Sequence, residues 1–121
     1  MAEAPRERPE HSVVLARFDG HVCARPKPVF EAITRILDPG PDARSDFLAD
    51  ASRSLVVAQG GWWYRAEYRV VPDERGSLVE HYLVNTSGRE KRFGKPVGRG
   101  QLEKAPAEFD MLLRRLREEL E

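Results

Sequence analysis

The hydrophobic pattern is most regular at the end of the chain, from Pro106 to Glu121. Five apolar residues recur there at helical spacing: Phe109, Leu112, Leu113, Leu116 and Leu120. This spacing aligns them in one stripe along an α-helix and leaves the charged residues on the remaining surface. Pro106 suits the first helical turn, where its missing N–H has no partner to lose. The pattern predicts an amphipathic C-terminal helix that packs on another layer.

The stretch Ser12–Ala24 alternates with a period of two instead, as a half-buried strand does. One face carries Val14, Ala16, Phe18, Gly20, Val22 and Ala24, and the other carries Arg17, Asp19 and His21. Because Gly20 interrupts an apolar face, it predicts a bulge or a close approach of another segment.

Helical spacing then returns at Pro28 and continues to Leu37, where the sequence Asp38-Pro39-Gly40-Pro41 ends the helix. Its apolar face consists of Val29, Phe30, Ile33, Ile36 and Leu37. The stretch Asp42–Arg53 is ambiguous. Phe47, Leu48 and Ala51 fit a short second helix there, and Ser45 fits its N-cap.

The clearest hairpin joins strands Trp62–Val71 and Leu78–Ser87 through a turn at Pro72–Ser77. A shorter strand, Ser54–Ala58, precedes it. Pairing Val71 with Leu78 fixes the register of the hairpin. In this register, four pairs share the face opposite to Val71 and Leu78: Val70 with Val79, Tyr68 with His81, Ala66 with Leu83, and Tyr64 with Asn85. The opposite face, expected to meet solvent, carries Arg69 opposite Glu80, Glu67 opposite Tyr82 and Arg65 opposite Val84.

The predicted inner face of the hairpin carries a polar group among apolar neighbours. Tyr64, Tyr68, His81 and Asn85 all point toward the C-terminal helix in this register. Buried polar groups need partners. They either satisfy one another in a packed core or line a cavity, since binding pockets are mainly apolar with a few convergent polar groups.

Composition narrows the function classes. Lys plus Arg and Asp plus Glu are both 20, so the net charge is zero, which argues against a dedicated nucleic-acid binder. The one cysteine excludes an internal disulfide and fits a reducing, cytoplasmic compartment. No apolar run has the length of a membrane span, so no stable membrane insertion is expected. The basic, glycine-rich stretch Gly88–Gly100 predicts a mobile connection.

Several chemical motifs are missing from the sequence. It contains no Gly-rich phosphate loop after a strand and no serine in a nucleophile elbow. The three histidines do not stand at metal-ligand spacing with one another or with Cys23. We therefore expect neither a bound metal nor a cofactor.

The order of strand, helix, antiparallel strands and long C-terminal helix resembles the helix-grip fold of the START-like (SRPBCC) superfamily. This superfamily includes polyketide cyclase/dehydrase-like proteins and lipid-transfer domains. Three stretches carry the resemblance: HVCARPKPVFEAI at His21–Ile33, GGWWYRAEYRVVPDERGSLVEHYLVN at Gly60–Asn85, and the closing helix Phe109–Glu121. The resemblance covers most of residues 12–121 and implies an apolar cavity between the sheet and the C-terminal helix. The family has a larger sheet, and a further short strand is a candidate around Lys91–Val97.

We therefore expect one α+β domain at residues 12–121, an antiparallel sheet wrapped around a long C-terminal helix, after a flexible tail at residues 1–11. The leading hypothesis is that it binds a small hydrophobic or amphipathic molecule in the implied cavity. The candidate ligand-binding residues are Phe18, Tyr64, Tyr68, His81, Leu83, Asn85, Phe109 and Leu113. Two alternatives stay open. One is a cyclase- or dehydratase-like enzyme in which Tyr68 or His81 moves a proton. The other is a protein-interaction module with a filled core.

Overall fold

The elements follow one another as a strand, a helix, four strands and a long helix. A computed structural model describes residues 3–41, 46–60, 64–86 and 95–121. The elements are β1 (Val13–Val22), α1 (Pro26–Leu37), β2 (Asp46–Asp50), β3 (Leu55–Gly60), β4 (Tyr64–Asp73), β5 (Gly76–Asn85) and α2 (Lys95–Leu120). The predicted α+β class is confirmed.

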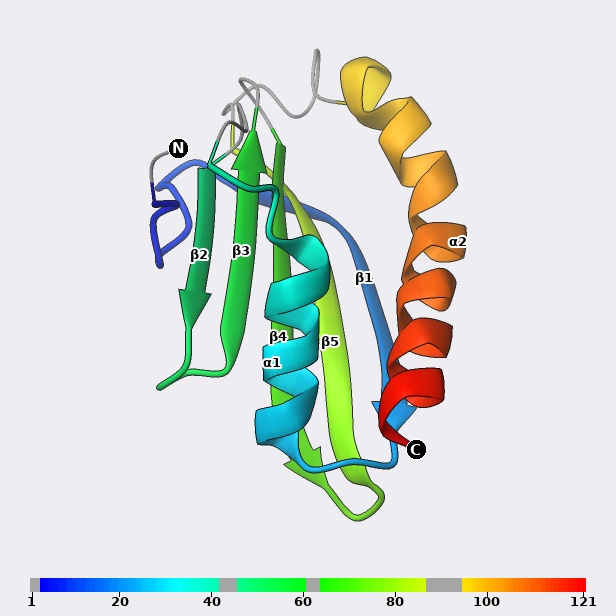
Figure 1. Ribbon diagram of the computed structural model, residues 1–121. Helices are drawn as coiled ribbons and strands as arrows, with labels where there is room; N and C mark the ends of the chain where they lie inside the picture. Colours follow the sequence, from blue (N-terminus) through cyan, green and yellow to red (C-terminus); the bar gives the residue numbers. More distant parts are fainter. Residues whose placement is uncertain (1–2, 42–45, 61–63, 87–94) are drawn as a thin grey trace.

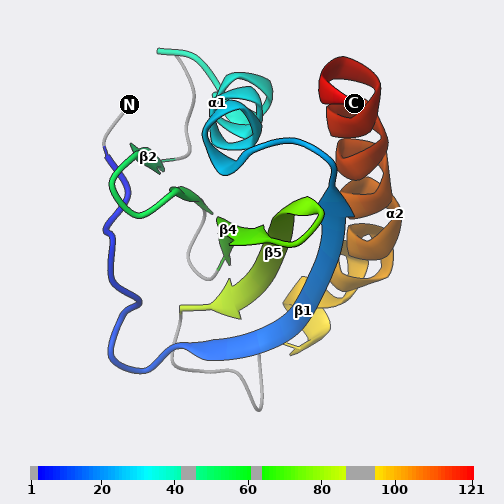
Figure 2. The same ribbon diagram turned by 90° about the horizontal axis from the view of Figure 1, so that it is seen from below.

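The five strands form one antiparallel sheet in the order β1-β5-β4-β3-β2. Both helices lie on the same face of this sheet, with α2 beside β1 and α1 across the middle strands (Figures 1 and 2). We call this the inner face. The N-terminal segment runs along the opposite, outer face (Figure 2).

The β4–β5 hairpin has the register predicted from its hydrophobic pattern. Tyr68 pairs with His81 and Arg69 with Glu80, and the remaining predicted pairs agree as well. The inner-face apolar residues Ala66, Val79 and Leu83 are all buried. The alternation was decisive because a slip by one residue would turn this whole set toward the other face.

Gly20 lies where α2 approaches β1 most closely. A Cβ atom built on Gly20 would come within 2.3 Å of Leu113 Cδ1, which is closer than two non-bonded carbon atoms approach in proteins. Gly20 therefore marks the predicted close approach, while the strand's irregularity lies between Val14 and Ala16. The end of α2 is also tied to this strand, since the Arg117 guanidinium donates to the His21 carbonyl at 2.9 and 3.1 Å.

Both helices begin earlier than the sequence pattern predicted. α1 starts at Pro26 rather than Pro28, and both prolines lie in its first turn. α2 starts at Lys95, so Pro106 is inside the helix rather than at its beginning. A proline inside a helix costs one backbone hydrogen bond, and the apolar stripe beyond it offsets that cost by burial.

Two predictions of secondary structure were wrong. The ambiguous stretch around Phe47 and Leu48 is strand β2, paired with β3, and not a short helix. The candidate strand around Lys91–Val97 is contradicted from Lys95 onward, because α2 has begun there. The fifth strand is therefore β2. The proposed cap Ser45, the strand start at Trp62 and the basic stretch up to Gly94 lie outside the described residues.

The main core lies between the inner face and the two helices. It joins Val29, Phe30 and Ile33 of α1, Val22, Val56, Val70 and Val79 of the sheet, and Phe109, Leu112, Leu113 and Leu116 of α2. Leu116 and Ile33 are fully buried. The stripe that predicted α2 is thus the surface that closes the core, and Met111, outside the stripe, is 66% exposed.

The outer face is also covered in part, which the alternating pattern of the strands did not indicate. Ala4 is 2% exposed and packs with Leu48, Leu55 and Val57. Its N–H donates to the Phe47 carbonyl at 3.2 Å, so the segment touches the edge strand β2. Residues 3–8, expected as part of a flexible tail, lie across the sheet in this structure. We call them the N-terminal strap.

Candidate functional site

The eight candidate ligand-binding residues all lie on the inner face or on the side of α2 that meets it. Phe18, Tyr68, His81 and Phe109 form one aromatic group, and Leu113 continues it into the main core. Tyr64 and Leu83 belong to a second cluster with Ala66, Ala105 and Leu102, and Asn85 is fully buried at the end of β5. The sequence pattern therefore placed the candidate residues together.

The rings of Tyr68 and His81 stack face to face. Their centroids are 4.2 Å apart and their planes differ by 5°. The imidazole also lies 5.4 Å from the Phe109 ring and 5.8 Å from the Phe18 ring. His81 is thus enclosed by three aromatic rings and is 4% exposed. The side-chain hydrogen bond between Tyr68 and His81 that a closed core suggested does not occur among the described contacts.

The hydrogen bonding of His81 fixes the role of each ring nitrogen. Nδ1 lies 3.1 Å from the backbone carbonyl of Glu67. A carbonyl can only accept, so Nδ1 carries the proton, and Nε2 is the acceptor of the neutral ring. Burial lowers the pKa of His81, and the bond to Glu67 opposes this only in part. The ring is therefore neutral at physiological pH.

Tyr68 keeps its proton as well. Burial raises the pKa of its hydroxyl, and the nearby Tyr64 and Glu108 raise it further. Burial raises the pKa of the neighbouring Tyr64 in the same way. The inner face thus presents neutral hydroxyl and imidazole groups among aromatic and aliphatic side chains, an arrangement suited to hydrogen bonding with an uncharged polar group.

Two described pockets lie elsewhere on the molecule. One, of about 460 Å³, lies between α1 and the end of α2, where Arg35 bonds Glu119 at 2.6 Å. The other, of about 540 Å³, opens on the outer face beside the N-terminal strap. Neither of these two pockets is lined by Tyr68 or His81.

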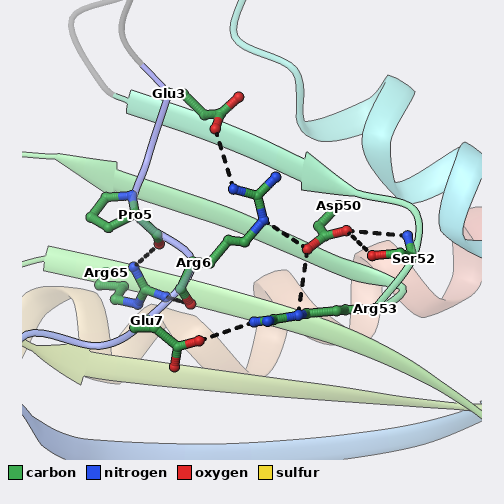
Figure 3. A network of polar contacts seen from close by, with 8 residues as sticks. All are labelled: Glu3, Pro5, Arg6, Glu7, Asp50, Ser52, Arg53 and Arg65. Carbon is green, nitrogen blue, oxygen red and sulfur yellow. Dashed lines mark hydrogen bonds and ion pairs between the residues drawn. The ribbon is translucent and has the colours of Figure 1, made fainter.

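The outer face holds a charged network that sequence reasoning missed. Arg65 is fully buried, and Glu67 is 6% exposed, although both had been assigned to solvent. Arg65 donates to Glu67 at 2.8 Å and to the backbone carbonyls of Pro5 and Arg6 at 2.7 and 2.9 Å. Its contacts with the strap carbonyls are shown in Figure 3. The strap is held by its backbone as well as by its side chains.

Glu67 also accepts hydrogen bonds from an arginine of the strap, Arg8. Arg8 bonds both of its carboxylate oxygens, at distances from 2.7 to 3.1 Å. Burial alone would raise the pKa of Glu67, but the hydrogen bonds and charges of Arg8 and Arg65 outweigh burial and lower it. Asp50 anchors the strap in the same way by accepting from Arg6 at 2.9 Å (Figure 3).

One feature of the sequence signals this cover. Leu55, Val56 and Val57 are consecutive apolar residues, and all three are buried. A strand with one solvated face alternates, whereas a strand covered on both faces is apolar throughout. The apolar run therefore indicates a second layer over β3, although it does not identify which segment supplies it.

The described residues contain no group of three His, Cys, Asp or Glu side chains arranged to hold a metal. Within the same part of the chain, no helix has both the length and the apolar character of a membrane span. Comparison of the chain with known protein families, with curated proteins and with solved structures found no significant match.

Proposed function

We propose that this chain is a compact START-like helix-grip protein that binds a small hydrophobic or amphipathic molecule between the sheet and α2. Two features support the family assignment. The order of elements agrees with the resemblance, and the C-terminal helix packs on β1 through an apolar stripe. The proposal concerns the inner face, where the candidate residues gather.

The stacked Tyr68–His81 pair carries this proposal. Both side chains are neutral and polar, and they stand among the rings of Phe18 and Phe109. An uncharged hydroxyl or carbonyl group on an apolar molecule could bond the Tyr68 hydroxyl or His81 Nε2, with apolar surface around it. The Tyr64 end of the inner face suits entry, because its cluster contains the small side chains Ala66 and Ala105.

The same groups favour binding over proton-transfer catalysis. A general acid or base works best when its pKa lies near the working pH. Burial lowers the pKa of His81 and raises the pKa of Tyr68. Both pKa values therefore move further from pH 7, so that His81 stays unprotonated and Tyr68 stays protonated. Each is therefore better suited to hold a ligand than to exchange protons with one.

A paired substitution tests the site. Tyr68→Phe with His81→Phe removes both polar groups and keeps most of the volume. We expect the double variant to fold and to bind the neutral dye Nile red with altered affinity. Native mass spectrometry of the purified parent protein should also show a copurified small molecule, and the double variant should lose it.

The outer face offers a matched control. Tyr82→Phe with His21→Phe makes the same chemical change outside the inner face. This control should bind Nile red like the parent. The proposal would be contradicted if the two double variants bound Nile red with equal affinity and if neither the parent nor the variants carried a copurified molecule. That outcome would favour a protein-interaction module with a filled core, with which the close ring stacking around His81 agrees.

A further inference from the structure

The outer-face pocket beside the N-terminal strap is independent of the inner face. It has a volume of about 540 Å³, and the sheet and the strap both contribute to it. Arg69, Glu67, Glu80 and Tyr82 line it from the sheet, and Arg6 and Arg8 line it from the strap. This volume lies within the usual range of small-molecule sites, roughly 300–1,000 Å³.

Three glutamates line the pocket, and each is paired with an arginine: Glu7 bonds Arg53 at 3.0 Å, and the other two are Glu67 and Glu80. Glu67 accepts from Arg8 and from the buried Arg65. Glu80 bonds Arg17 at 3.0 Å, so its charge is taken up from the β1 side. All three carboxylates are therefore held by arginines and do not repel an incoming anion as free carboxylates would.

Arg69, in contrast, lacks such a partner. It faces Glu80 across the β4–β5 hairpin and is exposed, but among the residues that the structure describes no carboxylate lies within ion-pairing distance of it. Arg8 bonds Glu67 through Nε and Nη2, so no described hydrogen bond uses its Nη1 donors. Two guanidinium groups with spare donors thus line one pocket, one on β4 and one on the strap.

The ring of Tyr82 contacts the guanidinium groups of Arg8 and Arg17. The guanidinium carbon of Arg8 lies 5.3 Å from its centroid, and that of Arg17 lies 5.7 Å from it. Cation–π contacts hold a guanidinium without using its N–H donors. The donors of Arg8 that Glu67 leaves unused therefore stay available to a ligand.

We propose that this pocket binds a small anion with a carboxylate or phosphate group, held between Arg69 and Arg8. The planar fork of a guanidinium matches such oxyanions with two parallel hydrogen bonds. Because Arg69 belongs to the sheet and Arg8 to the strap, the bound anion also ties the strap to the sheet. Binding and strap attachment are then coupled.

The test uses inorganic phosphate and citrate as probes at constant ionic strength. Each is titrated into the full chain while NMR follows the Nε–H signal of Arg69, the Nη signals of Arg8 and the amide exchange of residues 3–8. We expect saturable shifts of both arginine signals and slower exchange in the strap. Arg69→Gln should weaken binding about tenfold or more, since it removes the charge and both hydrogen bonds of the guanidinium.

Two further variants sharpen the test. Arg69→Lys keeps the charge but loses the fork, so its affinity should fall between those of the parent and Arg69→Gln. Arg114→Gln removes an exposed arginine from α2 and should bind like the parent. Shifts that rise linearly with both probes, or equal affinities for Arg69→Gln and Arg114→Gln, would overturn the proposal.

Discussion

The two faces of this sheet are covered in different ways. The inner face meets two helices through apolar side chains, with Leu116 and Ile33 fully buried. The outer face meets a short strap without regular structure, held by Arg65, Glu67 and Asp50. One sheet thus combines a cover that depends on burial with one that depends on charge pairing.

This difference shows what alternation along a strand can establish. A period of two tells which residues share a face, because successive side chains point to opposite sides. It does not tell whether the polar side faces solvent. Arg65 and Glu67 were placed on the correct face, yet they are buried there because the strap lies over them. Charged residues on a strand indicate solvent only when no segment offers them partners.

The largest expected effect concerns the helical cover. Leu116→Ala removes a fully buried side chain from the stripe of α2. It should lower the free energy of unfolding by about 3–5 kcal/mol, as large truncations in a packed core do. Met111→Ala, on the exposed side of the same helix, is the control and should change stability by less than about 0.5 kcal/mol. Urea denaturation of both variants measures the contrast, and similar midpoints would refute this placement of α2.

The charged cover should be nearly as sensitive at its centre. Arg65→Met leaves the buried Glu67 with Arg8 alone and removes the donors to Pro5 and Arg6. We expect a loss of about 3 kcal/mol, the low end for breaking a buried ion pair, because Arg8 remains. Arg114→Met, at an exposed position of α2, should be nearly neutral. Adding Glu67→Gln to Arg65→Met should recover part of the loss, and a further loss would contradict the assignment.

The same contrast explains which parts of the fold were predictable. The α2 stripe and the β4–β5 register follow from periodic patterns, in which each residue supports the next. Strand β2 does not follow from such a pattern. A short run containing Phe47 and Leu48 fits either a helix or a strand, and pairing with β3 decides between them. The early start of α2 at Lys95 lies in a stretch rich in glycine, where local preference opposes a helix.

The strap was the least predictable element. Its sequence has charges and prolines but no regular spacing, so it was expected to be part of a flexible tail at residues 1–11. Its anchors, Asp50 and Glu67, are more than forty residues away in the chain. The pairing of Tyr68 with His81 was predictable for the opposite reason, since the local hairpin brings these two residues together. The rings of Phe18 and Phe109, which also pack against His81, come from elements distant in the sequence.

A third prediction concerns the contact between the helical cover and β1. Gly20→Ala places a methyl group against Leu113, where a Cβ would lie 2.3 Å from Cδ1. Leu113 is buried, so its side chain has little room to move, and overpacking should cost about 1–3 kcal/mol. Gly100→Ala is the control. It meets nothing within 4 Å in helix α2 and should stabilise by about 0.5–1 kcal/mol. A neutral Gly20→Ala would contradict the tight packing of Leu113 against this strand and would show that its side chain moves aside.

The stabilities contributed by the two faces should depend on pH in different ranges. The pKa of His81 is lowered by burial, so the unfolded chain takes up its proton near the ordinary value of 6.5 before the folded chain does. Stability from the inner face should therefore fall as the pH drops below that value. The pKa of Glu67 is lowered by its arginines despite burial, so its contribution is present above 4.5 and is lost at more acidic pH.

Free energies of unfolding measured from pH 8 to pH 3 test this order. His81→Gln should flatten the upper part of the pH dependence, and Glu67→Gln should flatten the lower part. If His81→Gln altered only the lower part, the inner-face ring would not be held neutral by burial.

The smallest expected effect concerns the exposed end of the outer face, beyond the strap. Arg69 and Glu80 are cross-strand neighbours, as predicted, but Glu80 bonds Arg17 of β1 at 3.0 Å instead. A double-mutant cycle of Arg17→Gln and Glu80→Gln should therefore give a small but measurable coupling energy, as exposed ion pairs do. The cycle of Arg69→Gln and Glu80→Gln should give a coupling near zero. Chemical denaturation of the single and double variants at low salt measures both cycles, and added salt should weaken the first. A larger coupling for Arg69 would mean that it pairs with Glu80 after all, and would take away the free cation on which the anion site depends.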